Sequence, residues 1–302
     1  ETLNRISKRI QINEEIKQKV TLANKHVKND MRLKKAEFFS KLPDFLTVVH
    51  FGGNPCDMKK IYDLSIKYGF KIIEDASHAL GASYDNMMIG ENNFSLASVF
   101  SFHPVKMITT GEGGAILLSS EEDQKKACRL RSHGIVSTNS LETNKKPGWY
   151  YEQQDLGYNF RMSELQAALG SSQIERLKYF IEKRNILAKY YRDHLSGLPL
   201  KFQKILPNCL SSYHLFTVEL TDKNYLRDEL YRFLQANKIG CQVHYIPVHL
   251  QPYYKRQGFC SGMFENAENY FRNCLSIPLH QGLEEIDIKY VCDKLTVFFA
   301  KS

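Results

Sequence analysis

The sequence has few of the features that mark membrane, secreted or zinc-bound proteins. No apolar run approaches the roughly 20 residues that a membrane-spanning helix needs. The opening stretch, ETLNRISKRIQINEE, lacks the apolar core of a secretory signal. The seven cysteines are scattered, and none forms a CxxC pair. An odd and dispersed set argues against both a disulfide framework and a zinc site. We therefore expect a cytoplasmic protein without a metal site.

Acidic residues are in deficit, because 33 Asp and Glu face 41 Lys and Arg, which gives a formal net charge of +8. Much of the excess lies in residues 7–39, where acidic and apolar residues are interleaved with the basic ones. A basic face for nucleic acid is one interpretation of this stretch. A solvated helix surface is the interpretation we favour, because no nucleic-acid recognition motif is present. We expect neither a nucleic-acid nor a membrane partner, whereas anionic small substrates suit a basic protein.

The pattern of apolar residues predicts an α/β protein. Residues 46–51 and 70–75 read as buried strands, and residues 57–69 between them have helical spacing with a glycine at the end. This order predicts a strand–helix–strand unit in a mainly parallel sheet with flanking helices. Two further strands are expected at residues 96–102 and 114–120.

The rest of the chain predicts a helical connection and a smaller second domain. A capping box at Ser163 and Gln166 opens a helical pattern that continues, with a break near Gly170, to about Ser196. The other expected elements are a helix at 121–134, a loop at 136–155, a strand at 211–220, a helix at 224–240, a strand at 241–247 and terminal helices. We predict a large domain at residues 1–196 and a small α+β domain at residues 197–302.

Asp75 and Lys106 are the positions where the sequence points to chemistry. Asp75 closes a predicted strand, and Lys106 follows the strand that ends at Ser101. Ligands of open α/β sheets bind beyond the carboxyl ends of the strands, so an acid and an amine can face one cleft there. A Schiff-base amine must be available without its proton, and pyridoxal phosphate also needs an anion beside its ring nitrogen. Spacing alone leaves a structural ion pair, or two unrelated surface groups, as alternatives.

Five motifs in register carry a family resemblance. They are EDASHALGASY, SFHPVKMITTGEGGA, RSHGI, LGYNFRMSELQAALG and VHYIPVHLQPYY. Together they resemble the DegT/DnrJ-type sugar aminotransferases, over about residues 46–300. Within this family the likeness is strongest to the branch that serves pseudaminic acid synthesis. The resemblance implies a fold-type I pyridoxal phosphate enzyme that transfers an amino group from L-glutamate to a nucleotide-linked 4-keto-6-deoxy sugar. It favours a UDP-linked over a dTDP-linked sugar, used in surface glycan biosynthesis.

The resemblance also implies roles for individual residues. Lys106 would bind the cofactor covalently and move protons, and Asp75 would pair with the ring nitrogen. His78 would lie near the cofactor ring, and Ser101 would bind the phosphate. Asn159 would reach the phosphate in the partner subunit's site, which implies a homodimer with shared active sites. The nucleotide-sugar contacts implied are His244, His249 and Arg161.

Several of these residues have plainer structural explanations. His78 is also typical of a hydrogen-bonded core histidine, and Asn159 of a turn or cap. Gly111, Gly113 and Gly114 need serve only a tight turn, although the N–H groups of such turns also bind anions. Arg131 and His133 are more typical of a helix end than of a substrate contact.

One expected family feature is not found before Asp75. It is the turn, rich in small residues, whose N–H groups bind the cofactor phosphate at a helix N-terminus. We therefore expect the large domain to be incomplete at its N-terminal end. This leaves a second hypothesis, in which the chain is a truncated, non-catalytic relative that binds a partner subunit or a nucleotide-sugar.

Overall fold

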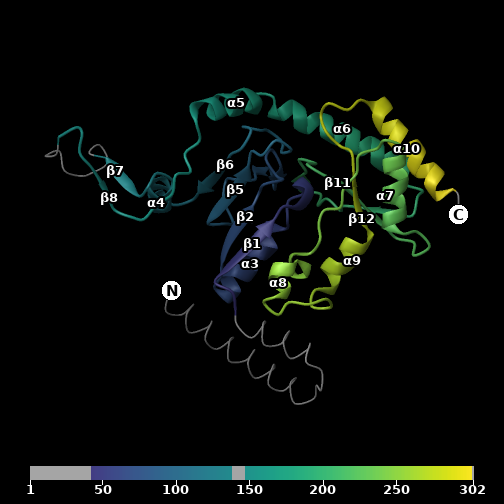
Figure 1. Cartoon of the computed structure of the whole chain (residues 1–302), viewed down its shortest axis with the longest axis horizontal. Coiled ribbons are helices and arrows are strands. Elements are labelled where there is room, and N and C mark those ends of the chain that lie inside the picture. Colours follow the sequence, from purple (N-terminus) through teal and green to yellow (C-terminus); the bar gives the residue numbers. More distant parts are fainter. Residues whose placement is uncertain (1–41, 138–146, 301–302) are drawn as a thin grey trace, which may run out of the picture.

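The computed structural model describes residues 42–137 and 147–300 of the 302-residue chain. The basic stretch at residues 7–39, and the nucleic-acid interpretation based on it, lie outside these residues. Figure 1 shows a sheet beside two consecutive long helices, α5 (Glu164–Ile174) and α6 (Leu177–Leu195). The C-terminal helices α7 (Arg227–Ala236) and α10 (Glu285–Phe299) lie near the far end of α6 (Figure 1).

A four-stranded sheet of order β1-β2-β5-β6 forms the N-terminal part. Its strands are β1 (Phe45–Val49), β2 (Lys71–Asp75), β5 (Ala97–Ser101) and β6 (Gly114–Leu118). β1, β2 and β5 are parallel, and β6 is antiparallel to β5. Helix α3 (Met58–Tyr68) connects β1 to β2, and it ends at Gly69, whose φ of 75° suits a residue without a side chain. The predicted strand–helix–strand unit and the mainly parallel sheet are confirmed.

The two faces of this sheet differ in burial. The core on one face includes Val48, Met58, Ile72 and Phe100. On the other face, the strand register places Val49, Asp75 and Val99 side by side. There Val49 is 45% exposed and Val99 is 38% exposed. Because side chains alternate along a strand, Ser101 shares this face with Val99. The open face therefore carries Asp75 and Ser101 at its carboxyl end.

A second, smaller sheet joins segments that are distant in sequence. Its strands, in the order β10-β3-β4, are β10 (Cys209–Leu210), β3 (Ser83–Tyr84) and β4 (Met87–Met88). All pairs in it are antiparallel. The segment that follows β2 is thus held against a segment from the C-terminal part of the chain.

A short arm follows the main sheet. It consists of helix α4 (Glu121–Arg131) and the antiparallel strands β7 (Ile135–Ser137) and β8 (Tyr151–Gln153). Figure 1 shows this arm extending away from the sheet. The expectation of a loop throughout residues 136–155 is wrong at both ends, because Val136 pairs with Glu152 across the two strands.

The two long helices begin as the sequence predicts. The Ser163 side chain accepts a hydrogen bond from the N–H of Gln166, and the Gln166 side chain accepts one from the N–H of Ser163. This confirms the capping box. The break lies at Glu175 and Arg176 rather than near Gly170, which is inside α5. Helix propensity alone misplaced the break, because glycine is tolerated inside a helix at a modest cost.

The C-terminal part combines an antiparallel sheet with helices. The sheet has the order β12-β11-β9, with β9 (Leu200–Phe202), β11 (Phe216–Leu220) and β12 (Cys274–Ile277). The helices are α7 (Arg227–Ala236), α8 (Pro252–Lys255), α9 (Glu265–Asn273) and α10 (Glu285–Phe299). Short 3-10 turns lie at Phe51–Gly53 and Val248–Leu250.

Three expectations for this part need correction. The strand expected at 211–220 begins only at Phe216, because Tyr213 has a φ of 47°, which interrupts an extended chain. The strand expected at 241–247 is reduced to a single bridge between Gln242 and Ser276. The expected run of terminal helices is interrupted by β12, whose four residues are all buried.

The described residues form two apolar cores. One lies around the main sheet, and the other includes residues of α6, α7, α10 and the C-terminal sheet. Leu187, Tyr191 and Leu195 of α6 belong to the second core. The long helix is therefore packed on the C-terminal part, and a domain boundary at residue 196 stays a prediction.

Two findings concern membranes and metals. Across residues 42–137 and 147–300, no helix has both the length and the apolar character that a membrane crossing demands. Within the same residues, no three His, Cys, Asp or Glu side chains gather as metal ligands.

Candidate active site

The segment between β5 and β6 carries Lys106. This segment is closed at its base, where the N–H of Phe102 donates to the carbonyl of Gly113 at 2.9 Å. A Cβ added to Gly114 would lie 2.6 Å from the carbonyl oxygen of Phe100, so only glycine fits where β6 starts against β5. The predicted turn that returns the chain to the sheet is confirmed.

Asp75 and Lys106 interact electrostatically from different segments. Asp75 ends β2, and its Oδ1 accepts the N–H of Ser77 at 3.0 Å. Burial lowers the pKa of Lys106 below its usual value, and the charge of Asp75 raises that pKa by a smaller amount. The amine therefore loses its proton more readily than a solvent-exposed lysine does, as an amine nucleophile must. The structure brings the two residues together, and their catalytic roles stay predictions.

His78 is fixed beside this pair. Its side chain is 7% exposed, and its Nδ1 accepts the N–H of Gly52 at 3.2 Å. Burial and the charge of Lys106 lower the pKa of His78 to about 4, although Asp75 acts in the opposite sense. The ring is therefore neutral near pH 7.

Two more histidines share the surroundings of Lys106. The ring of His214 lies 4.4 Å from the ring of His78, measured between centroids. The Nδ1 of His244 lies 2.7 Å from Oγ of Ser276. Burial, with the Lys106 charge as a further cause, lowers the pKa of both His214 and His244. The prediction that His244 lies at the site is thus consistent with its position, and its contact with substrate is untested.

Aromatic rings border the same region. The rings of Phe51 and Tyr245 lie 6.1 Å and 6.5 Å from the ring of His78, and 6.2 Å from each other. Tyr245 is 52% exposed. A flat ligand beside His78 would therefore meet an aromatic border that remains partly open to solvent.

Ser101 lies at the end of β5, on the sheet face that carries Asp75. It pairs with Gly114 across the sheet, and its Oγ accepts the N–H of His103 at 3.4 Å. The Oγ lies at the base of the Lys106 segment, where its hydroxyl hydrogen is available to an incoming anion.

Asn159 and Arg161 lie elsewhere. Both are exposed, on the segment that connects β8 to α5. Backbone bonds between this segment and α4 hold it, such as the Phe160 N–H to the carbonyl of Arg131 at 2.9 Å, and Asn159 itself bridges to Ser132. The structure does not bring Asn159 or Arg161 to Asp75 and Lys106 within one chain, so the expected contact across a dimer stays a prediction.

His249 is a buried residue of the C-terminal part. Its side chain is 7% exposed, and its Nε2 lies 2.9 Å from Oε1 of Glu268 in α9. Oε2 of Glu268 accepts the hydroxyl of Ser261 at 2.8 Å, and Oε1 accepts the N–H of Gly262 at 2.7 Å. The structure thus gives His249 a bracing contact and does not place it beside Lys106; its predicted substrate contact is untested.

Sequence reasoning missed His214, Phe51 and Arg184. His214 precedes β11 in an apolar segment, where a lone histidine looks like a core residue. Phe51 is followed by two glycines directly after β1, a signal of a tight turn at the carboxyl end of a strand that could have been used. Arg184 lies inside a helix with ordinary helical spacing, so nothing in the sequence marks it as buried.

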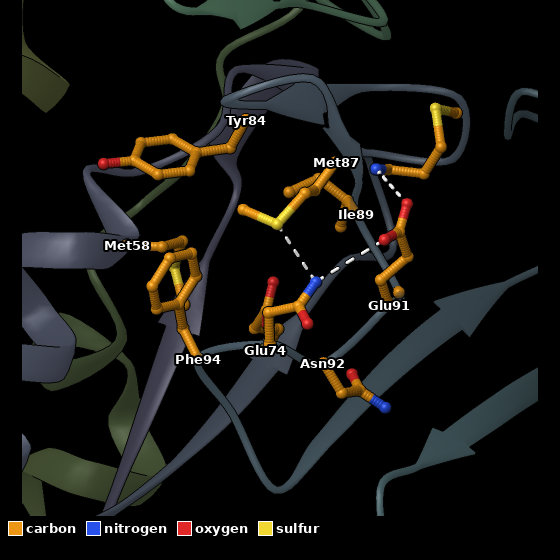
Figure 2. A pocket seen from close by; sticks show the side chains of 11 residues that line it. Met58, Glu74, Tyr84, Met87, Ile89, Glu91, Asn92 and Phe94 are labelled. Atoms are coloured by element: carbon orange, nitrogen blue, oxygen red, sulfur yellow. Dashed lines mark hydrogen bonds between the residues drawn. The ribbon is translucent and has the colours of Figure 1, made fainter.

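A small apolar pocket lies near Glu74 but does not share the site's chemistry. Figure 2 shows Met58, Tyr84, Ile89 and Phe94 around it. Glu74 alternates with Asp75 along β2 and so faces the opposite side of the sheet. Its carboxylate is already bound by His50 Nε2 at 2.7 Å and by Ser95 Oγ at 2.5 Å. This pocket therefore belongs to the packing behind the sheet.

Comparisons with known proteins agree on one family. Residues 36–296 match the model of the DegT/DnrJ/EryC1/StrS aminotransferase family. A UDP-4-amino-4,6-dideoxy-N-acetyl-beta-L-altrosamine transaminase from Campylobacter jejuni is 40% identical over 252 residues, which cover 83% of this chain and 64% of that protein. The chain thus spans less than two thirds of the length of this relative.

Solved structures show the same fold. PseC from Helicobacter pylori, an aminotransferase involved in the biosynthesis of pseudoaminic acid, matches with a TM-score of 0.77 at 29% identity, over 85% of this chain and 67% of that one. DesV from S. venezuelae matches with a TM-score of 0.75 at 30% identity, over 89% of this chain and 68% of that one. The predicted fold-type I architecture is confirmed.

Proposed function

Because the chain belongs to the DegT/DnrJ/EryC1/StrS aminotransferase family, we propose that it transfers an amino group to a nucleotide-linked sugar for glycan biosynthesis. The observation that carries this proposal is the half-buried Lys106 amine, whose pKa the charge of Asp75 raises and burial lowers. Aminotransferases of this family use pyridoxal phosphate, and the residues present suit that cofactor. They offer an amine of lowered pKa, a carboxylate and a flanking neutral histidine.

Pyridoxal phosphate, when bound, supplies a reactive carbonyl carbon and an electron-withdrawing ring. Lys106 would bind that carbon and then carry protons as a general acid and base. Asp75, oriented by the N–H of Ser77, would hold the proton on the ring nitrogen. Ser101 would donate its hydroxyl to the phosphate, and His244 would contact the sugar nucleotide.

We further propose that the acceptor is a UDP-linked 4-keto-6-deoxy sugar and that the donor is L-glutamate. The acceptor class is supported by the names of the transaminases from Campylobacter jejuni at 40% identity and Helicobacter pylori at 33% identity. The exposed Tyr245 beside the site offers a stacking surface for the uracil base.

The active unit that we propose is a homodimer. Exposed apolar side chains surround Asn159 and Arg161, with Leu156 91% exposed, Phe160 69% and Leu165 85%. An apolar strip of this kind is typical of a protein interface. A partner subunit placed here would bring Asn159 and Arg161 to its neighbour's site.

Borohydride trapping tests the central claim. The protein is mixed with pyridoxal phosphate and reduced with borohydride, and the modified lysine is located by mass spectrometry of its peptides. We expect the cofactor to be fixed to Lys106 and not to Lys189, an exposed lysine of α6. Lys106→Ala should abolish trapping and transfer, whereas Lys189→Ala should leave both unchanged.

Two outcomes would contradict the proposal. Trapping on lysines in general, at a rate that Lys106→Ala does not reduce, would remove Lys106 from the chemistry. A folded protein that binds a nucleotide-sugar but no cofactor would favour the alternative, a non-catalytic binding protein.

The acceptor and the dimer need separate measurements. Incubation with L-glutamate and UDP-, dTDP- or GDP-linked keto-sugars should give an aminated product only from the UDP-linked sugar. Sedimentation should show a dimer that Leu165→Glu dissociates, while Ile286→Glu, at another exposed apolar residue, in α10, leaves it intact. A monomer that turns over at the same rate would exclude shared active sites.

A further inference from the structure

His78 is held in one tautomer by the backbone. A backbone N–H can only donate a hydrogen bond, so the Nδ1 of His78, 3.2 Å from the Gly52 nitrogen, carries a lone pair. In a neutral ring the proton then lies on Nε2. The contact thus makes Nε2 a donor, and it disfavours a charged ring, in which Nδ1 would also carry a proton.

The turn at Phe51–Gly53, which makes this contact, is hydrogen-bonded to the segment that contains His214. The N–H of Leu215 donates to the carbonyl of Gly52 at 3.2 Å, and the N–H of Ser212 donates to that of Gly53 at 3.0 Å. The hydroxyl of Ser212 also donates to the carbonyl of His78 at 2.7 Å. The backbone of residues 212–215 and the Ser212 hydroxyl therefore set the position of both partners of the Gly52–His78 contact.

The ring of His214 contributes to this arrangement by packing alone. It lies 4.4 Å from the ring of His78 at an angle of 42°, and its side chain is 7% exposed. Its Nδ1 is buried and has no hydrogen-bond partner among the described residues. Its position is therefore not fixed by that nitrogen, and its ring covers His78 against water.

The charged and titratable groups around the two rings favour the uncharged state. The charges of Lys106 and His244 act against protonation of both rings, and Asp75 favours a charge on His78. Arg184 acts against protonation of His214, and its guanidinium also donates to the carbonyls of Tyr213 and His214. Water would stabilise a charge on His78, and the His214 ring, 4.4 Å from the His78 ring, covers His78 on one side.

We propose that His214 is a positioning residue that keeps His78 uncharged, held on the Gly52 amide, with its Nε2–H directed as a donor at an acceptor oxygen of the bound cofactor. The last part rests on the proposed function, and the tautomer itself does not. The feature required of residue 214 is a flat, water-excluding ring, and its nitrogens are dispensable.

The test is NMR of the 302-residue chain labelled in its histidine nitrogens, recorded without cofactor. The His78 signals are identified by their loss in His78→Gln. We expect Nδ1 to be unprotonated, Nε2 to be protonated, and no titration above about pH 5. His214→Ala should move the titration midpoint up, toward the ordinary value of about 6.5, and mix the tautomers. His214→Phe, the matched control that keeps a ring, should behave as the unchanged protein does.

A structural role without positioning would give a different result. If His214→Ala folds and His78 still resists titration in a single tautomer, the proposal is overturned. A His214→Phe protein that titrates like His214→Ala would overturn it as well. Should the alanine variant fail to fold, His214→Val provides the same comparison with a smaller cavity.

A second readout connects the tautomer with the cofactor. Pyridoxal phosphate should bind about fivefold more weakly to His214→Ala and equally well to His214→Phe. Equal affinity in all three proteins would overturn the donor role toward the cofactor. If no protein binds the cofactor, the proposed function fails, while the cofactor-free spectra still decide the role of His214.

Discussion

Lys106 and Asp75 lie 31 positions apart in sequence, yet the charge of one changes the pKa of the other. Burial lowers the pKa of the lysine, and the aspartate partly restores it. Burial makes the amine easier to deprotonate, and Asp75 compensates the charge of the partly buried ammonium. The sheet sets the positions of both residues. Asp75 ends β2 and Lys106 follows β5, and the two parallel strands have their carboxyl ends on the same side of the sheet.

The first prediction concerns this balance. Asp75→Asn removes the charge that raises the pKa of Lys106, so the amine should become reactive at lower pH than in the unchanged protein. The measurement is the pH dependence of Lys106 labelling by an amine reagent, followed by mass spectrometry without cofactor. Labelling of the exposed Lys189 serves as an internal control and should keep its profile. An unshifted Lys106 profile would mean that the two residues do not interact.

The second prediction concerns the glycines of the Lys106 segment. An alanine Cβ at position 114 would lie 2.6 Å from the Phe100 carbonyl, whereas at position 111 nothing lies within 4 Å. Gly114→Ala should destabilise the protein by roughly 1–3 kcal/mol, as overpacked sites do. Gly111→Ala should lower the stability by only about 1 kcal/mol, because a φ of 78° forces alanine into the left-handed region. Urea unfolding measures both, and an equal loss at the two positions would refute the steric explanation.

The main sheet was predictable because its signals are local. The run from Phe45 to Asp75 contains two apolar strands and a helix with both a cap and a terminal glycine, and each agrees with the others. Where local signals were weak, the prediction was wrong. The segment at 241–247 has the composition of a strand but makes only one bridge, between Gln242 and Ser276, at the free edge of β12.

The site was predictable only in part, for a related reason. Asp75 and Lys106 follow strands, so the position of each depends on a local pattern and on the rule that strand ends face the ligand. His214 reaches the site from a segment more than 100 residues later, through backbone bonds to Gly52 and Gly53. Sequence periodicity contains no information about such a long-range contact, and neither does a single sequence without relatives.

The third prediction concerns acid stability. Hydrogen bonds from His249, Ser261 and Gly262 lower the pKa of Glu268 from 4.5 to about 2. Because the folded-state pKa lies below the unfolded one, the carboxylate stabilises the fold above about pH 4.5, and this contribution is lost as the pH falls toward 2. Glu268→Gln should therefore cost roughly 1–3 kcal/mol at pH 7 and progressively less in acid.

Urea unfolding at several pH values measures this difference. The exposed Glu265, at the start of the same helix, provides the control, and Glu265→Gln should change stability by less than about 0.5 kcal/mol at every pH. A Glu268→Gln deficit that stays constant down to pH 3 would show that packing, and not the charge, is what the substitution removes.

The last prediction concerns Arg184, which connects α6 to the segments at residues 213–214 and 279–281. Its guanidinium donates to the carbonyls of Tyr213 and Leu279 at 2.9 and 2.8 Å and to Oε1 of Gln281. Burial lowers its pKa to about 10, which still leaves it charged at neutral pH. Arg184→Met removes the donors and leaves buried carbonyls without partners, a loss of roughly 3 kcal/mol.

The same substitution should also loosen the segment that carries His214. We expect faster amide hydrogen exchange at residues 211–215 in Arg184→Met, measured by mass spectrometry at constant pH. Lys189→Met, which removes a charge from the exposed side of the same helix, should change neither stability nor exchange. If exchange at residues 211–215 is unaffected while global stability falls, Arg184 supports the core of the C-terminal part and does not brace the site.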